Sequence, residues 1–307
     1  MATKTITLNI RPRGKPIQTL PEVVSVESDA STSDLYSKLA SQAQSSVHRL
    51  RVTKGSDGSL VSSDGKTTIY STGLRDQSTV YVKDLGPQIS WQTVFIVEYL
   101  GPLLIHPAFY FLQPYIYGKN AYPSLSQSTF FALICLHFVK RELETLFVHR
   151  FSLATMPARN IFKNCAHYWI LGGLNIAPWV YRPSAPTATQ SPNTVLLYSG
   201  IVIYVIGELG NLSSHLTLKG LRSAGGKERG IPQGVFFRLV TCPNYMFEIL
   251  AWFGMYFVSN LSWALLVMLV VSAGQMIIWG KKKERRYRKE FGDKYKKKRS
   301  TVLPGII

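Results

Sequence analysis

Apolar runs as long as a bilayer is thick recur through most of this chain. They begin at Trp91, whereas the sequence up to Gly86 is polar and rich in Ser and Thr and has no such run. A helix needs about 20 apolar residues to cross the hydrocarbon core of a membrane. The sequence therefore predicts a small soluble domain at residues 1–86 and an all-α membrane domain at residues 87–307, with about six to seven transmembrane helices.

The loops between these runs predict the topology. The predicted spans lie near residues 92–114, 128–149, 164–181, 194–217, 234–257 and 261–280. An even number returns the carboxyl terminus to the side on which the chain starts, and the loops on that side carry most of the Lys and Arg. Positive loops face the cytosol, and "MATKTITLNI" lacks the apolar stretch of a secretory signal. Both termini are therefore predicted to be cytosolic.

The net charge of +18 could suggest nucleic acid, but its distribution indicates a membrane surface. Lys281–Arg299 contains twelve Lys and Arg against three acids, directly after the last apolar run. Such clusters attract anionic headgroups or fix topology, so no nucleic-acid partner is expected. The three cysteines (Cys135, Cys165 and Cys242) lie in the apolar part without metal-ligand spacing, which predicts reduced, buried thiols.

The first domain is predicted to be α+β. Residues 3–12 alternate like a strand, residues 13–20 form a turn into a second strand, and residues 29–44 have helical spacing. Further strands are predicted at 48–54, 67–70 and 78–85. This order resembles the ubiquitin-like (β-grasp) fold. No nucleophile and base cluster in it, so a docking or stabilising role is expected.

Polar residues follow one face of the predicted fourth span. Spacings of three, four, four and three separate Glu208, Asn211, His215, Lys219 and Arg222, which places all five on one stripe of a helix. Other spans also carry ionisable or polar residues: Glu98; His137, Lys140, Arg141 and Glu144; and Thr241, Tyr245, Glu248 and Trp252. Ionisable groups cost roughly 2.5–3.5 kcal/mol each in a bilayer and need partners. A polar cavity open to the cytosol is therefore predicted among the helices.

Each of these residues also has a structural interpretation. Glu98 could form a buried ion pair with Lys140 or Arg141, and His137 could make only an interhelical hydrogen bond. A metal site built from His137, His215 and Glu98 is not expected, because the histidines have no close partner such as HxxxH. No metal is therefore predicted.

The outer members of the stripe and the tyrosine of the fifth span leave alternatives open as well. Lys219 and Arg222 could contact lipid phosphates, and Tyr245 could fill a helix interface. The basic tail could serve topology alone, with Tyr287 and Arg288 the positions most able to do more.

Several motifs in order resemble one enzyme family. They are "VEYLGPL", "KRELETLFVHRFS", "MPARNIFKNC", "GNLSSHLTLKGLR", "CPNYMFEILAW" and "YRKEF". Together they resemble the very-long-chain trans-2-enoyl-CoA reductases of the steroid 5α-reductase superfamily, whose architecture includes an amino-terminal ubiquitin-like domain. The resemblance implies reduction of long-chain enoyl-CoA by NADPH, the last step of fatty-acid elongation in the endoplasmic reticulum membrane. It also implies a supply of sphingolipid precursors, and as partners the membrane lipids and other elongase components.

The same resemblance implies a cofactor wall built from helices. Its members would be Asn211, His215, Lys219, Arg222, Asn244, Glu248, Trp252 and Tyr287. Charge supports this wall independently, since a pyrophosphate and a 2′-phosphate need Arg and Lys. No GxGxxG follows a strand in this chain, so a Rossmann site is not predicted.

Conjugate reduction needs a donor near the thioester oxygen and a proton for the α-carbon. By resemblance, Tyr245 is the catalytic tyrosine that donates the proton or stabilises the enolate, Lys140 is its electrostatic partner, and Glu98 matches the glutamate of the steroid reductases. The sequence departs from those enzymes in "HFVKR", where Phe138 replaces their tyrosine and cannot donate a proton.

Three other functions stay open on the sequence. One is another activity of the superfamily, such as steroid or polyprenol reduction. The second is a membrane methyltransferase that uses S-adenosylmethionine on a similar helical architecture. The third is a non-catalytic adaptor, against which the intramembrane polar residues argue.

Overall fold

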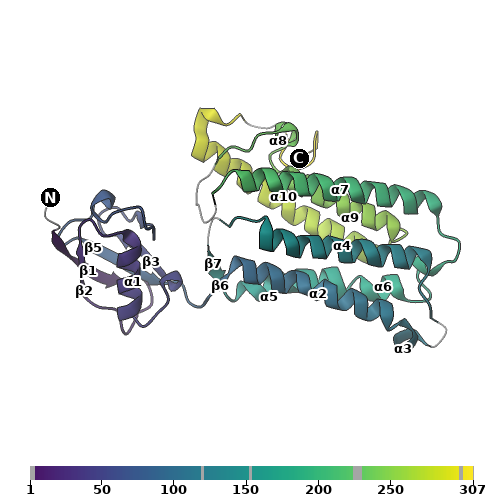
Figure 1. Ribbon diagram of the computed structural model, residues 1–307, viewed down its shortest axis with the longest axis horizontal. Helices are drawn as coiled ribbons and strands as arrows, with labels where there is room; N and C mark the ends of the chain where they lie inside the picture. Colours follow the sequence, from purple (N-terminus) through teal and green to yellow (C-terminus); the bar gives the residue numbers. More distant parts are fainter. Residues whose placement is uncertain (1–3, 119–120, 152–153, 224–229, 297–299, 307) are drawn as a thin grey trace. The chain divides into compact units, whose positions relative to one another are not determined.

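A computed structural model describes residues 4–118, 121–151, 154–223, 230–296 and 300–306 (Figure 1). The chain forms two compact units. The first comprises Met1–Ser90 and Ala154–Asn160, and the second comprises Trp91–Leu153 and Ile161–Ile307. Each unit has its own hydrophobic core.

The amino-terminal unit contains a five-stranded sheet with a helix on one face. The strands are β1 (Thr5–Pro12), β2 (Val23–Glu27), β3 (Leu50–Lys54), β4 (Leu60–Val61) and β5 (Thr79–Asp84), and the helix is α1 (Thr32–Gln42). The strand order is β2-β1-β5-β3-β4. β1 and β5 are parallel and the other neighbours are antiparallel. The unit also contains a separate antiparallel pair, β6 (Gln88–Ser90) and β7 (Thr155–Pro157).

Alternation in the sequence builds this core. Ile6, Leu8 and Ile10 occupy every second position of β1 and are buried, because side chains along a strand point to alternate faces. α1 begins with a capping box, in which the Ser31 side chain accepts from the Asp34 amide and the Asp34 carboxylate accepts from the Ser31 amide. The helix and first strand therefore form where the sequence predicts them.

The strand predicted at residues 67–70 is wrong. Thr68 makes only an isolated bridge to Ser31, and a 3₁₀ turn follows at Tyr70–Thr72. Ile69 gives this segment the look of a strand, but its side chain fills the core and its amide donates to the Ala30 carbonyl in the loop before α1. The short strand β4, which the sequence did not suggest, pairs with β3 instead.

The second unit is helical. Its helices are α2 (Trp91–Phe111), α3 (Gln113–Tyr117), α4 (Leu125–Phe147), α5 (Asn160–Cys165), a π-helix (Ala166–Leu174), α6 (Ala177–Tyr181), α7 (Thr194–Gly220), α8 (Val235–Leu239), α9 (Pro243–Val258) and α10 (Trp263–Phe291). The 3₁₀ turns are Val47–Arg49 and Tyr70–Thr72 in the first unit, and Pro186–Ala188 and Gly292–Lys294 in the second.

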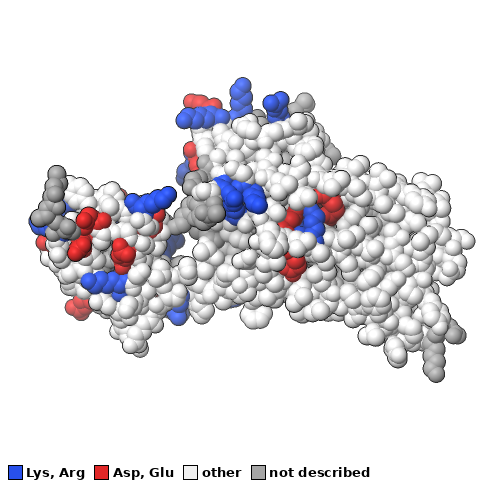
Figure 2. All heavy atoms as spheres, in the orientation of Figure 1, with Lys and Arg blue, Asp and Glu red and all other residues white. Residues whose placement is uncertain are grey.

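In the part of the chain that the structure describes, three helices are long and apolar enough to cross a membrane: Trp91–Phe111, Thr194–Gly220 and Trp263–Lys294. α4 is long but charged, α9 has 16 residues, and the helical stretch at 160–181 is interrupted. The chain is therefore a membrane protein, and the predicted count of six to seven spans stays a prediction. On the face drawn in Figure 2, no charged side chain of a described residue lies around α3, and Lys and Arg gather toward the end of α10.

Glycines bring α7 and α9 into close contact. A Cβ on Gly207 would lie 2.5 Å from the Ala251 nitrogen, and one on Gly254 would lie 2.5 Å from the Tyr204 nitrogen. Small residues at a helix interface let the backbones approach, which gives membrane helices their packing energy. The polar residues of α7 and α9 are thereby brought within hydrogen-bonding distance.

Residues after α10 return to the start of α9. The Thr241 and Cys242 amides donate to the carbonyls of Ser300 (3.3 Å) and Thr301 (2.9 Å). Val302 is fully buried, and a Cβ on Gly280 of α10 would lie 2.6 Å from its Cγ2. This segment therefore fixes α10 against α9.

A buried carboxylate strengthens the same junction. Glu284 of α10 accepts hydrogen bonds from the Thr241 hydroxyl and, at 2.6 Å, from the Tyr295 hydroxyl. Burial raises the pKa of the Tyr295 phenol above its usual range. Tyr295 is therefore neutral and donates to the carboxylate.

Candidate active site

The polar stripe predicted on α7 does share one face. Glu208, Asn211 and His215 face α4 and α9 and make polar contacts there. Lys219 and Arg222 lie at the carboxyl end of α7, where their side chains donate to backbone carbonyls at and after the end of α4, at 2.9 and 2.5 Å. The stripe therefore runs from the interior of the helical unit to one of its ends.

Lys140 of α4 lies at the centre of a buried polar layer. Its ammonium donates to Asn211 Oδ1 (2.7 Å) and lies 2.9 Å from Glu208 Oε2 and 3.3 Å from Glu144 Oε1. A cation buried among helices is tolerated only with such partners. Lys140 thus links α4 to α7.

Glu248 connects the same layer to α9. Its Oε2 accepts from Asn211 Nδ2 (3.0 Å), and its Oε1 accepts from Trp252 Nε1 (3.3 Å). His137 lies between two carboxylates, with Nδ1 2.6 Å from Glu208 and Nε2 3.4 Å from Glu248. His137 of α4 therefore contacts side chains of α7 and α9, which is the interhelical contact given as its structural interpretation.

Arg141 lies at the edge of the layer nearest the carboxyl ends of α4 and α7. Its Nη1 donates to Glu144 Oε2 (2.6 Å) and lies 3.4 Å from His215 Nδ1, and its Nη2 donates to the Tyr99 hydroxyl (2.8 Å). His215 Nδ1 in turn lies 3.0 Å from Glu144 Oε2. Arg141 also reaches the cavity described next.

A cavity of about 630 Å³ opens above this layer, at the end of the unit where α4 and α7 end and α9 begins. This volume lies in the range of small-molecule sites, about 300–1,000 Å³. Among the described residues that line it are seven Lys and Arg and one acid: Arg141, Arg150, Lys219, Arg222, Lys282, Lys283, Arg286 and Glu290. Six aromatic side chains among the same residues complete the wall: Trp91, Phe95, Phe151, Tyr245, Trp279 and Tyr287. The cavity therefore suits a ligand with several negative charges and a flat ring.

Two groups in the wall have hydrogen-bonding capacity to spare. Asn244 Oδ1 is buried without a hydrogen-bond partner among residues that the structure describes. The Tyr245 hydroxyl also has none in these ranges, and its ring packs 6.4 Å from that of Trp279. Both residues occupy the first turn of α9, where the helix dipole favours negative charge. A buried acceptor left unpaired is costly, so a bound donor is expected at Asn244.

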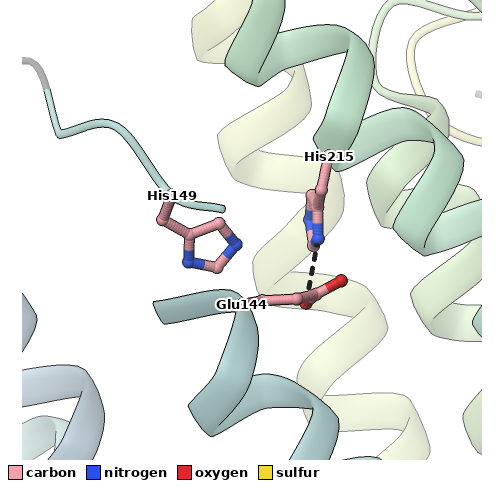
Figure 3. A group of neighbouring side chains, drawn as sticks. All are labelled: Glu144, His149 and His215. Atoms are coloured by element: carbon pink, nitrogen blue, oxygen red, sulfur yellow. Dashed lines mark ion pairs between the residues drawn. The ribbon is translucent and has the colours of Figure 1, made fainter. Parts of the chain in front are cut away.

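A group of three side chains has the types and spacing of a metal site. Glu144, His149 and His215 place one ligand atom each within 4.8 Å of one another (Figure 3). Arg141 donates to the same Glu144 oxygen that contacts His215, and Lys140 lies 3.3 Å from the other oxygen. Two cations therefore already hold this carboxylate, and the donor set does not fit an added dication.

The residues predicted for the cofactor divide between cavity and layer. His215, Lys219, Arg222, Asn244 and Tyr287 line the cavity. Asn211, Glu248 and Trp252 lie beneath it in the hydrogen-bonded layer.

Among the residues predicted for catalysis, Tyr245 lines the cavity, and Lys140 and Glu98 do not. The predicted pairing of Lys140 with Tyr245 differs from the geometry, because Lys140 is held by Glu208 and Asn211. The cavity cations whose charges act on Tyr245 are Lys283 and Arg141.

Glu98 is buried on α2, where it lies beside Asn164. Its Oε2 has no hydrogen-bond partner within the described ranges. The alternative of an ion pair with Lys140 or Arg141 is not found among the described contacts either. Phe138, which replaces the tyrosine of steroid reductases, packs in the core against Tyr99 and Trp252.

Three cavity cations were missed because they lie in the basic tail. α10 continues without a break from its apolar part to Phe291, which brings Lys282, Lys283 and Arg286 to the cavity. Helical spacing could have found Lys283, which lies four residues before Tyr287, and could have paired Lys282 with Arg286, which also lie four residues apart. Arg288 instead points toward Glu284 (3.9 Å) and does not line the cavity.

Fold and site thus define a membrane protein whose helical unit has a cation-lined cavity at one end. A family model described as 3-oxo-5-alpha-steroid 4-dehydrogenase matches residues 154–307. The very-long-chain enoyl-CoA reductase of Dictyostelium discoideum is 42% identical over 292 residues, which are 92% of this chain and 94% of that protein. A Schizosaccharomyces pombe protein named as an enoyl reductase is 42% identical over 302 residues, 98% of this chain and 100% of its own length. The trans-2,3-enoyl-CoA reductase-like protein of Homo sapiens is 33% identical over 254 residues, 78% of this chain and 67% of that protein.

The chain belongs to the 3-oxo-5-alpha-steroid 4-dehydrogenase family and, within it, to the enoyl-CoA reductases. Membership makes it an oxidoreductase that acts on CH–CH groups.

Proposed function

We propose that this protein reduces very-long-chain trans-2-enoyl-CoA to saturated acyl-CoA with NADPH, as the last step of fatty-acid elongation. The names of its relatives support the substrate class. The observation that carries the choice of cofactor is the cavity wall, whose described residues include seven cations and one acid. Such an excess suits a pyrophosphate with an added 2′-phosphate.

The residues present fit a phosphorylated nicotinamide. The cations from α7 and α10, Lys219, Arg222, Lys282, Lys283 and Arg286, would hold the phosphates. The unpaired Asn244 Oδ1 would accept a hydrogen bond from a carboxamide, and the aromatic side chains would pack against flat rings. When bound, the cofactor supplies a hydride to the β-carbon of the enoyl thioester.

Tyr245 is proposed to supply the proton. Its hydroxyl faces the cavity without a competing partner among the described side chains, so it can donate to the thioester oxygen or to the α-carbon. As the proton leaves, Lys283 and Arg141 stabilise the phenolate by their charge. Lys140 is proposed to act one layer below, where it holds Asn211 and therefore the relative position of α4 and α7.

The architecture around this site is part of the proposal. Six spans with both termini and the cavity mouth in the cytosol would place the charged CoA head in water and the acyl chain between helices. The endoplasmic reticulum membrane, its lipids and other elongase components are the proposed surroundings. The mixed five-stranded sheet with one helix supports a ubiquitin-like fold for the amino-terminal unit.

The function is tested with purified protein in detergent. Oxidation of NADPH should require a long-chain trans-2-enoyl-CoA, and the saturated acyl-CoA should form in equal amount. A steroid enone and S-adenosylmethionine with a prenylcysteine test the other activities of similar helical proteins. Turnover of either, with none of the enoyl-CoA, would refute the proposal.

A matched pair of variants tests the role of Tyr245. We expect Tyr245→Phe to lower kcat about 10²–10⁴-fold, the usual contribution of a positioned acid. Tyr198→Phe, on an exposed position of α7, removes the same atom away from the cavity and should have no effect. Full activity in Tyr245→Phe would remove this residue from the mechanism.

A further inference from the structure

The sheet of the amino-terminal unit has one covered and one open face. Leu8, Val52 and Val82 point to the face that α1 covers and are fully buried. On the other face, Arg11 of β1, Arg51 of β3 and Lys83 of β5 are exposed. Arg13, which follows β1, extends the same surface. We call these four cations the basic sheet face.

Two of these cations oppose each other directly. Arg51 and Lys83 are register partners in the antiparallel pair of β3 and β5. Like charges in this arrangement repel and destabilise a sheet. An arrangement that lowers stability without a ligand becomes favourable when an anion binds between the two charges.

The surface between them is concave. Arg13, Arg51, Thr53 and Lys83 line a hollow of about 170 Å³. Thr53 forms its floor, with 4% of its surface exposed, and its hydroxyl accepts from Arg13 Nη1 at 3.4 Å. Since a water occupies about 30 Å³, the hollow has room for a hydrated phosphate group.

Acids do not neutralise the basic sheet face. The ion pairs described in this unit join Arg49 to Asp84 and Lys54 to Asp57. Among the residues that the structure describes, no carboxylate lies within ion-pairing distance of the four cations. Their charge is therefore available to an external anion.

The covalent connection of the unit favours a membrane as the source of that anion. β5 ends at Asp84 and the membrane helix α2 begins at Trp91, so six residues join them, of which the last three form β6. Extended, these residues reach at most about 20 Å. The unit is thus tethered near the bilayer, and the attraction of an anionic surface acts over about 8 Å at physiological salt. Tyr81, exposed beside Lys83, is a residue type that sits well at headgroup level.

We propose that the basic sheet face docks on the phosphate headgroups of anionic lipids in the membrane that holds the helical unit. This inference does not rest on the reductase activity. An acidic segment of another protein is the competing partner, and the test below separates the two.

Lysine labelling of the full chain in nanodiscs measures the docking. One set of discs contains phosphatidylcholine alone and the other also contains phosphatidylserine. A water-soluble acylating reagent is added, and mass spectrometry follows Lys83 together with Lys66, an exposed lysine whose loop contacts the start of α1, as internal reference. We expect Lys83 to react about fivefold more slowly in anionic discs, from the attraction of one cation to the surface. High salt should remove the difference, and Lys66 should react equally in both.

Charge-reversed variants provide the control. Arg13→Glu with Arg51→Glu should abolish the protection of Lys83, whereas Lys66→Glu should preserve it. Hydrogen exchange of the buried strands reports whether each variant stays folded. Equal labelling of Lys83 in both kinds of disc would overturn the proposal. Protection by a soluble polyglutamate peptide in neutral discs, without protection by anionic lipid, would overturn it in favour of an acidic protein.

Discussion

Replacing Gly207 by alanine perturbs the closest approach of α7 and α9. The added Cβ would lie 2.5 Å from the Ala251 nitrogen and 2.9 Å from its Cβ. Backbone atoms cannot rotate away, so the two helices must separate. Overpacking costs about 1–3 kcal/mol, against which alanine gains up to about 1 kcal/mol in helix propensity. We expect a net loss of up to about 2 kcal/mol.

Gly274→Ala is the matched control, because nothing lies within 4 Å of a Cβ at this position of α10. It should gain the propensity without the clash. Thermal unfolding in detergent compares the two variants, and Gly207→Ala should unfold several degrees lower, at about 2–4 °C per kcal/mol for a unit of this size. Its activity should also fall, because Asn211 and Glu248 lie on the separated helices. The packing argument fails if Gly207→Ala unfolds at or above the temperature of Gly274→Ala.

Three further predictions concern charge and metal. Lys283→Met should raise the KM for NADPH about tenfold, since one charge-assisted contact is lost. Lys281→Met, at a position outside the cavity wall, should leave this KM unchanged. An equal KM for NADPH in the two variants would remove Lys283 from the site. Chelators should leave activity unchanged, because cations already hold Glu144; a loss that zinc restores would contradict this. Arg49 holds the pKa of Asp84 below its usual range, so their ion pair stabilises the sheet above about pH 4 and is lost on further acidification. Asp84→Asn should therefore reduce the acid sensitivity of exchange-protected amides in β3 and β5, by less than about 1 kcal/mol because the pair is partly exposed; an unchanged acid response would refute it.

The sequence predicted regular elements wherever one pattern repeats along a whole element. The alternation in β1, the helical spacing at residues 29–44 and the 3–4 spacing on α7 correspond to observed geometry. The strand predicted at residues 67–70 was wrong because Ile69 lies in a loop and its side chain fills the core of the domain. Composition alone cannot distinguish such a loop from a strand.

The site residues on α7 and α9 could be predicted from the sequence, because helical spacing places those of each helix on one face. Their partners on other helices were not. Lys140 was matched to Tyr245, yet in the structure it lies among Glu208, Glu144 and Asn211. The cation at Tyr245 comes from α10, whose basic part was interpreted as a tail. Which of several cations approaches a phenol depends on helix packing, and one sequence does not encode that in any local pattern.

The docking of residues 300–302 on the start of α9 has a consequence for biosynthesis. Because synthesis runs toward the carboxyl end, α7 and α9 can associate before Val302 has left the ribosome. The wall contributed by α10 can be locked only after that residue has left the ribosome. A stalled or prematurely terminated chain would then be integrated in the membrane yet unable to bind an anionic ligand.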